Sequence, residues 1–154
     1  KPSVFVVNKW DKIEKNHKTM AEFEKNLQLD FAFMDYAKVI YISALTGQRL
    51  NQIMPSVLEV YANAGKHISM GVLNTIVGDA ISSNPPPSVS GKRLKIVYVT
   101  QSSVYPPKFL FFVNDEMLVQ DSYKRYLEHR LRASFDFTGT PIKLLFRNNY
   151  DKDN

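Results

Sequence analysis

The sequence contains no cysteine, only six glycines and no long apolar run. Without cysteine it has no disulfide framework, no thiol nucleophile and no sulfur-ligated metal site. No apolar segment approaches the roughly 20 residues that are needed to cross a bilayer. The first residues, KPSVFVVNKWD, lack the long apolar core and the small-residue cleavage site of a signal peptide. We therefore expect a soluble, cytoplasmic protein.

The glycine positions exclude two nucleotide-binding and RNA-binding loops. Glycine occurs only at positions 47, 65, 71, 78, 91 and 139, so no two glycines are five residues apart. The phosphate-cradling loop G-x-x-x-x-G-K-[ST] is therefore absent. No two glycines are three residues apart either, which excludes the G-x-x-G clamp of RNA-binding KH domains. The three histidines show no ligand spacing, and the carboxylates form no obvious catalytic pair, so we expect no metal site and no catalytic residue.

The charge balance is mildly basic. Twenty Lys and Arg residues against fifteen Asp and Glu residues give a net charge of +5 and a pI near 9.3. This balance permits an anionic partner such as RNA, but it is weaker than the charge excess of a dedicated nucleic-acid binder.

Residues 1–66 alternate between strand and helix patterns. The apolar runs 4–7 and 39–42 are typical of strands that are buried on both faces. Each is followed by an amphipathic helical pattern, with apolar stripes Met20, Phe23, Leu27 and Phe31, then Leu50, Ile53, Met54, Val57 and Tyr61. This order predicts parallel α/β structure. Because two strands are too few to complete a doubly wound sheet, we expect further strands from sequence upstream.

Residues 67–148 follow a different pattern, which predicts an α-β-β-α-β domain. A helical stripe, Val72, Leu73, Ile76, Val77, Ala80 and Ile81, begins after Ser69 as its cap and ends before Pro85-Pro86-Pro87. Strands are expected at 93–100, 109–113 and 142–146, with a helix from about residue 122 before the last strand. In the first of these strands Leu94, Ile96 and Tyr98 are assigned to the helix-facing side. Residues 149–154 are expected to form a polar tail.

Two polar loops follow the buried strands of the first segment. Asn8-Lys9-Trp10-Asp11 comes directly after the first strand, and Ser43-Ala44-Leu45-Thr46-Gly47 after the second. The carboxyl ends of parallel strands are where open α/β sheets bind ligands. An Asp carboxylate can accept hydrogen bonds from N1 and N2 of guanine, and the Asn amide and the Lys stem can serve its acceptor edge and ring face. A backbone N–H at Ala44 could reach guanine O6.

These motifs and several further segments resemble one family. N-K-W-D and S-A-L-T-G are similar to the guanine-specificity motifs of P-loop GTPases. The whole chain resembles the Der/EngA family of bacterial GTPases, which have two G domains and a C-terminal KH-like domain. The likeness is carried by KPSVFVVNKWD, KTMAEFEKNL, FMDYAKVIYISALTG, NPPP, GKRLKIVYVTQ, PPKFLFFVND and GTPIKLLF.

The resemblance implies a division into three segments. Residues 1–66 would be the C-terminal half of a G domain, 67–148 the KH-like domain and 149–154 the tail. It also implies GTP or GDP binding, with guanine contacts from Asn8, Lys9, Asp11, Ser43, Ala44 and Leu45. Mg²⁺ and the phosphates would be held by upstream sequence, so we expect this chain alone to be inactive as a GTPase. Implied partners are the upstream G domain and the large ribosomal subunit with its RNA, and the implied role is ribosome biogenesis.

Two basic surfaces are candidates for binding RNA or a protein partner. Arg125, His129 and Arg132 share one face of the last predicted helix. Arg93, Lys95, Lys143 and Arg147 would form a rim around Val97, Val99 and Leu145 on the helix-free side of the sheet. Docking of an upstream G domain on this sheet face is our first interpretation and RNA our second.

Three functional hypotheses remain at the level of sequence. The first is a guanine-reading C-terminal piece of a ribosome-assembly GTPase. The second is a non-catalytic RNA- or protein-docking module in which the nucleotide motifs are vestigial. The third, an α/β enzyme of another kind, lacks any recognisable nucleophile–base arrangement.

Overall fold

The computed structural model describes residues 1–13 and 17–150, which form two compact units. The first unit comprises Lys1–Ala64 together with Phe137–Pro141, and the second comprises Gly65–Asp136 together with the residues from Ile142 onward. The short segment Phe137–Pro141 lies inside the range expected for the second domain but packs with the first unit.

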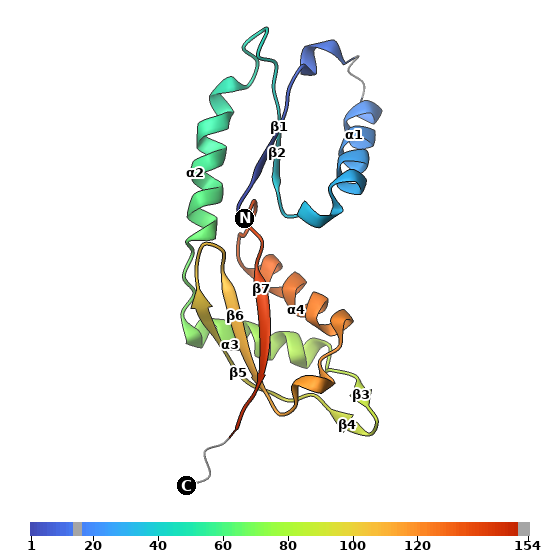
Figure 1. The fold of residues 1–154 in the computed structure, drawn as a ribbon, viewed down its shortest axis with the longest axis vertical. Helices are drawn as coiled ribbons and strands as arrows, with labels where there is room; N and C mark the ends of the chain where they lie inside the picture. Colours follow the sequence, from blue (N-terminus) through green and yellow to red (C-terminus); the bar gives the residue numbers. More distant parts are fainter. Residues whose placement is uncertain (14–16, 151–154) are drawn as a thin grey trace. The chain divides into compact units, whose positions relative to one another are not determined.

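The first unit is built from two parallel strands and two long helices. Its order is β1 (Val4–Val7), η1 (Trp10–Lys12), α1 (His17–Asp30), η2 (Ala32–Met34), β2 (Lys38–Tyr41), η3 (Leu50–Gln52) and α2 (Ile53–Ala64). Val4 pairs with Lys38 and Val7 with Tyr41. Helices α1 and α2 lie on opposite sides of the two strands (Figure 1). The predicted parallel α/β structure is confirmed.

The apolar stripe that indicated helix α2 in the sequence is not the face that the helix buries. The buried positions on α2 are Ser56, Val60, Asn63 and Ala64. Met54, Val57 and Tyr61 of the predicted stripe are 63%, 42% and 62% exposed. The helix therefore carries apolar residues on two faces, and periodicity alone does not tell which of them is buried.

The segment Phe137–Pro141 is bound into the first unit by backbone and side-chain contacts. Gly139 N–H donates to the Tyr36 carbonyl (2.8 Å), and Ser3 N–H donates to the Gly139 carbonyl (2.7 Å). Asn63 Nδ2 donates to the Thr138 carbonyl (3.0 Å). Phe137 and Thr140 are almost completely buried. Both backbone groups of Gly139 are therefore paired, and this residue closely approaches Val60 of α2.

The second unit is a three-stranded sheet with two helices on one face. Its order is α3 (Met70–Ser83), β3 (Ser88–Val89), β4 (Lys92–Arg93), β5 (Ile96–Ser103), β6 (Lys108–Val113), η4 (Glu116–Leu118), α4 (Asp121–Ser134) and β7 (Lys143–Asn148). The strand order is β5-β6-β7, with β5 antiparallel and β7 parallel to β6. The α-β-β-α-β order is confirmed, with a small β3–β4 hairpin added. The expected strand 93–100 is in fact divided between β4 and β5.

The core of the second unit lies between the helices and one face of the sheet. Leu73 and Val77 of α3 and Leu127 and Leu131 of α4 are at most 4% exposed. On the sheet, the buried side chains are Val99, Phe109, Phe111, Val113 and Leu144. Ser69 caps α3 as predicted, because its hydroxyl accepts a hydrogen bond from Val72 N–H (3.4 Å).

A β-bulge reverses the predicted sides of β5. Ile96 pairs with Val113, and the register shifts before Tyr98 pairs with Phe112. Val99 therefore faces the helices and is fully buried, whereas Tyr98 is 37% exposed on the helix-free side. The prediction that Tyr98 is internal and Val99 external was wrong, since one extra residue changes the side of every position that follows it.

The side chain of Asn74 on α3 pairs with the backbone of β5. Val99 N–H donates to Asn74 Oδ1 (2.9 Å), and Asn74 Nδ2 donates to the Val99 carbonyl (2.8 Å). This amide therefore satisfies both groups of a residue on the outer side of β5, where the sheet has no further strand.

Candidate guanine-nucleotide site

The two predicted loops lie together at the carboxyl edge of the first unit's strands. Ile42 N–H donates to the Val7 carbonyl (2.8 Å), and Trp10 N–H donates to the Ile42 carbonyl (3.1 Å). The parallel pairing thus continues from β1 and β2 into the loops that follow them. It brings Asn8–Asp11 beside Ser43–Thr46, although these segments are more than thirty residues apart in the sequence.

Asn8 bridges the two loops. Its Oδ1 accepts hydrogen bonds from Lys9 N–H (2.7 Å) and from Ala44 N–H (3.0 Å). The Ala44 N–H that was expected to reach guanine O6 is thus directed at Asn8, so a ligand oxygen would share or replace this bond. Among the described residues, Asn8 Nδ2 makes no hydrogen bond and can donate to an acceptor such as guanine N7.

Ser43 positions the carboxylate of Asp11. The fully buried Ser43 hydroxyl donates to Asp11 Oδ1 (2.6 Å) and accepts from Thr46 N–H (3.2 Å). The backbone of Ser43 also forms an antiparallel bridge with Gln48. A carboxylate whose orientation is set by a buried hydroxyl can present a defined acceptor to the N–H groups of a base.

An aromatic cluster fixes the Asn8–Asp11 loop to the core of the first unit. Trp10, which is 4% exposed, packs against Tyr41 (4.5 Å between ring centroids) and edge-on against Phe23 (5.9 Å). Burial, reinforced by the nearby Glu24 carboxylate, raises the pKa of Tyr41. The anchor holds the loop in a shape in which Lys9 adopts a left-handed conformation (φ 65°). Sequence reasoning missed Trp10 as an anchor, although an aromatic residue between polar motif residues is a signal for burial.

The exposed residues of the site carry groups that can recognise a ligand. Asn8, Lys9, Ala44 and Leu45 are exposed, and Leu45 is 82% so. With the half-buried Asp11 they offer an amide, an ammonium group, a positioned carboxylate and an apolar surface. Within the described residues no group of three or more His, Asp or Glu side chains is placed to hold a metal ion.

The four basic residues that were predicted to surround the sheet face fall in three places. Lys143 and Arg147 lie on the helix-free face of β7, opposite the buried Leu144. Arg93 belongs to the β3–β4 hairpin, and Lys95 lies between β4 and β5. The structure therefore does not place Arg93 and Lys95 in the three-stranded sheet with Lys143 and Arg147.

The basic face of α4 is partly neutralised. Arg125 and His129 are exposed, and Arg132 forms an ion pair with Glu128 one turn earlier (3.4 Å). Asp121 and Glu128 line a shallow groove with Lys124 and Arg125. Acidic and basic side chains are therefore mixed along this helix.

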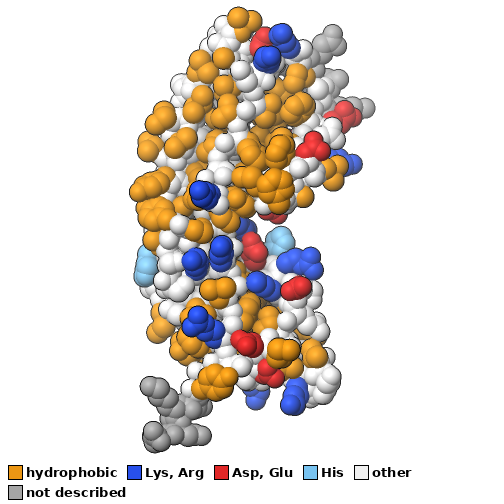
Figure 2. Space-filling view, in the orientation of Figure 1, with side chains coloured by type: hydrophobic (Ala, Val, Ile, Leu, Met, Phe, Trp, Pro, Cys, Tyr) orange, Lys and Arg blue, Asp and Glu red, His pale blue; other side chains and the backbone are white. Residues whose placement is uncertain are grey.

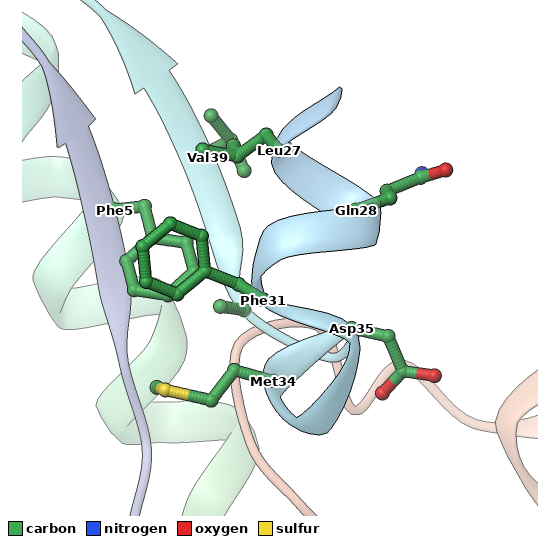
Figure 3. A pocket seen from close by; sticks show the side chains of 8 residues that line it. Phe5, Leu27, Gln28, Phe31, Met34, Asp35 and Val39 are labelled. Carbon is green, nitrogen blue, oxygen red and sulfur yellow. The ribbon is translucent and has the colours of Figure 1, made fainter. Parts of the chain in front are cut away.

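A pocket beside α1 has a packing role rather than a binding role. Its volume is about 80 Å³, and Phe5, Leu27, Phe31 and Val39 point into it, whereas Gln28 and Asp35 point away (Figure 3). Ligand pockets usually enclose several hundred Å³. In the described part of the chain, no helix has the length and apolar character required to cross a membrane.

Comparison with known proteins identifies related chains. A family model described as the KH-domain-like, C-terminal domain of EngA bacterial GTPase enzymes matches residues 67–147. GTPase Der from Clostridium acetobutylicum is 50% identical over 147 residues, which cover 96% of this chain and 34% of that protein. GTPase Der from Leuconostoc mesenteroides is 50% identical over 144 residues, 94% of this chain and 33% of that protein. The chain thus spans about one third of the length of these relatives.

A solved structure of Aquifex aeolicus Era covers 98% of this chain at 18% identity, with a TM-score of 0.33. That score is too low to support an argument about the fold.

Fold and matches together define the class of protein: a partial P-loop-GTPase-type α/β unit joined to a KH-like α-β-β-α-β domain. The chain belongs to the Der/EngA family of bacterial GTPases, of which it represents a C-terminal part.

Proposed function

We propose that this chain reads the guanine base for a GTPase that acts in the cytoplasm on the assembling large ribosomal subunit. Asp11 would accept hydrogen bonds from guanine N1 and N2, Asn8 would donate to N7, Lys9 would lie along the ring, and the Ser43–Leu45 loop would close over O6. The observation that carries the proposal is the pair of cross-loop hydrogen bonds, Ala44 to Asn8 and Ser43 to Asp11. These two hydrogen bonds hold donors and acceptors of both motifs at the carboxyl edge of strands β1 and β2.

Phosphate and Mg²⁺ binding would come from sequence outside this chain, which lacks a phosphate-cradling loop. Phosphoryl transfer depends mainly on positioning and charge stabilisation by that loop and the metal. The chain alone should therefore bind guanine nucleotides weakly and release no phosphate from GTP.

The specificity of the base site can be tested with nucleoside monophosphates. Charge-assisted hydrogen bonds contribute about 1.5–3 kcal/mol each, whereas a 1 mM dissociation constant already requires about 4.1 kcal/mol. We expect millimolar GMP, but not AMP, to shift the NMR signals of Trp10 and Ala44. Asp11→Asn should abolish the response to GMP and favour XMP, since an amide donor suits the carbonyl at C2 of xanthine.

Asp30→Asn, an exposed carboxylate at the end of α1, is the matched control and should respond as the parent chain does. Equal shifts with AMP and GMP, or an unchanged response of Asp11→Asn, would contradict guanine reading and favour the hypothesis of vestigial motifs.

A further inference from the structure

The end of helix α1 and the turn that follows it expose large apolar side chains. Leu29, on the last turn of α1, is 69% exposed, and Phe33, in η2, is 74% exposed. Leu27 points towards the strands (Figure 3), so Leu29, two residues further along the helix, lies on the side away from them. In the space-filling view, orange side chains gather over η2 and the end of α1 (Figure 2). We call Leu29, Phe31 and Phe33 the α1-end patch. Exposed apolar groups that gather in one place, unlike single ones, mark interaction sites.

The rings of the α1-end patch are held in place by the core of the first unit. The ring centroid of Phe31 lies 5.1 Å from that of Phe5 in β1 and 6.1 Å from that of Phe33, so the three rings form a series from the strand to the surface. The backbone of the turn is also fixed, because Phe31 N–H donates to the Leu27 carbonyl (2.9 Å) and Met34 N–H to the Phe31 carbonyl (2.8 Å). A ring that is already held in position loses little conformational entropy when it is covered by a partner.

Carboxylates flank the α1-end patch, although the whole chain is basic. Asp30 and Asp35 lie on either side of the two rings in the sequence and are exposed, and the Asp35 side chain points outward (Figure 3). Neither carboxylate forms an ion pair with a residue in the described ranges 1–13 and 17–150. Residues 19–37 carry Glu22, Glu24, Asp30 and Asp35 against the single Lys25, whereas the chain has a net charge of +5. The rings therefore lie in a locally acidic surface.

We propose that the α1-end patch docks a basic polypeptide segment of another protein, with an apolar side chain packed on Phe33 and cationic side chains paired with Asp30 and Asp35. An apolar centre with a polar rim is the usual anatomy of a protein interface, and aromatic anchors carry much of the binding energy. Charge complementarity selects the partner, because a cationic segment is attracted to this rim whereas the phosphates of a nucleic acid are repelled. A second copy of the chain fits less well, since a two-fold contact would bring the same carboxylates together.

The α1-end patch and the guanine motifs lie at opposite ends of strand β2. Helix η2 comes before Lys38, the first residue of β2, whereas the Ser43–Thr46 loop follows the end of this strand. The four residues of β2 span about 13 Å. A segment bound at the patch therefore leaves the carboxyl edge of the strands accessible. The docking proposal goes beyond guanine reading and does not depend on it.

The test is titration of the 154-residue chain with a fluorescein-labelled peptide of twelve residues, which carries six lysines and a central pair of leucines. Two comparison peptides have serines in place of the leucines or glutamates in place of the lysines, and both should bind more weakly. The NMR signals that shift should be those of residues 29–35. In fluorescence anisotropy, Phe33→Ser should weaken binding about 10-fold or more. Asp30→Asn with Asp35→Asn should weaken it about 3-fold or more at low salt and reduce its salt dependence.

Each variant has a matched control elsewhere in the chain. Met54→Ser replaces an apolar side chain on α2 that is 63% exposed and is the control for Phe33→Ser. Asp79→Asn with Asp121→Asn removes two carboxylates from exposed positions on α3 and α4. Both controls should bind the peptide as the parent chain does. Thermal unfolding followed by Trp10 fluorescence shows whether each variant is folded, and the carboxylate variant alone suffices if Phe33→Ser unfolds.

Several outcomes would overturn the docking proposal. One is a lysine–leucine peptide that does not bind at millimolar concentration, or that shifts signals only outside residues 29–35. Another is equal binding of the serine or glutamate peptide. If oligouridylate shifts the same signals, or if Phe33→Ser converts a dimer into a monomer in sedimentation, the occupant is a nucleic acid or a second copy instead. Displacement of the peptide by GMP would place it at the guanine motifs, which would overturn the docking site and leave guanine reading uncontradicted.

Discussion

Gly139→Ala should destabilise the first unit by more than a backbone effect alone. Gly139 has φ +83°, a conformation that side chains rarely adopt, and an added Cβ would overlap Val60 Cγ2 and lie 2.8 Å from Val60 Cγ1. The backbone cannot move away easily, because Gly139 N–H and C=O are both hydrogen-bonded, to Tyr36 and Ser3.

The expected loss of unfolding free energy combines two contributions. A left-handed conformation costs a residue with a side chain about 1–2 kcal/mol, and overpacking a closed site costs about 1–3 kcal/mol. The sum is about 2–5 kcal/mol. Gly47→Ala separates the contributions, because Gly47 has φ +77° and no atom within 4 Å of the added Cβ. This control should lose only the first 1–2 kcal/mol.

The measurement is denaturant unfolding followed by the fluorescence of Trp10, the only tryptophan, which is buried in the first unit. Adding Val60→Ala to Gly139→Ala should give a favourable coupling energy, since it removes the two overlapping methyl groups. If Gly139→Ala and Gly47→Ala lose equal stability, the segment Phe137–Pro141 does not pack against α2 as described.

Two further predictions concern the second unit. Asn74→Leu should lower the free energy of unfolding by about 2–4 kcal/mol, because it leaves the N–H and carbonyl of Val99 unpaired. Faster hydrogen exchange at Val99 and a lower melting temperature would show this loss, and unchanged exchange would contradict it. Burial, reinforced by the adjacent Tyr126, raises the pKa of Tyr123 to about 12 from 10.0. A raised pKa in the folded state means that stability is retained below pH 10 and lost as pH rises towards 12, so alkaline unfolding should be less steep in Tyr123→Phe; an identical pH profile would refute this cause.

The order of elements was predictable because it depends on local patterns. The strand at Val4–Val7 and the cap at Ser69 follow from runs and caps of a few residues. The inclusion of Phe137–Pro141 in the first unit was not predictable, because it depends on contacts with Tyr36, Asn63 and Ser3 that are distant in the sequence. The pairing of Asn74 with β5 is hidden for the same reason.

The uncovered apolar face of α2 illustrates a second limit. Met54, Leu58 and Tyr61 are apolar and at least 61% exposed, and β1 is paired on one side only among the described strands. An apolar stripe of this kind is typical of a buried helix face, but no part of the described chain covers it. The sequence pattern therefore predicted the helix correctly, but it did not indicate which face of the helix is buried.

Strand ends and strand faces differ in how securely a sequence predicts them, and the guanine-motif loops and the open face of the β5-β6-β7 sheet illustrate this difference. The loops that follow two parallel strands meet at the same edge of the sheet, and this does not depend on which side chains face up or down along the strands. Asn8 and Ala44 were therefore expected to lie close together, and they do. The face of the sheet on which a strand residue lies, by contrast, depends on whether the alternation of side chains is unbroken along the strand before it. One bulge between Ile96 and Tyr98 therefore exchanged Val99 for Tyr98 on the open face. That exchange places the aromatic ring of Tyr98 beside Phe112, where the sequence pattern had placed the aliphatic Val99, and so makes the open face more aromatic than predicted.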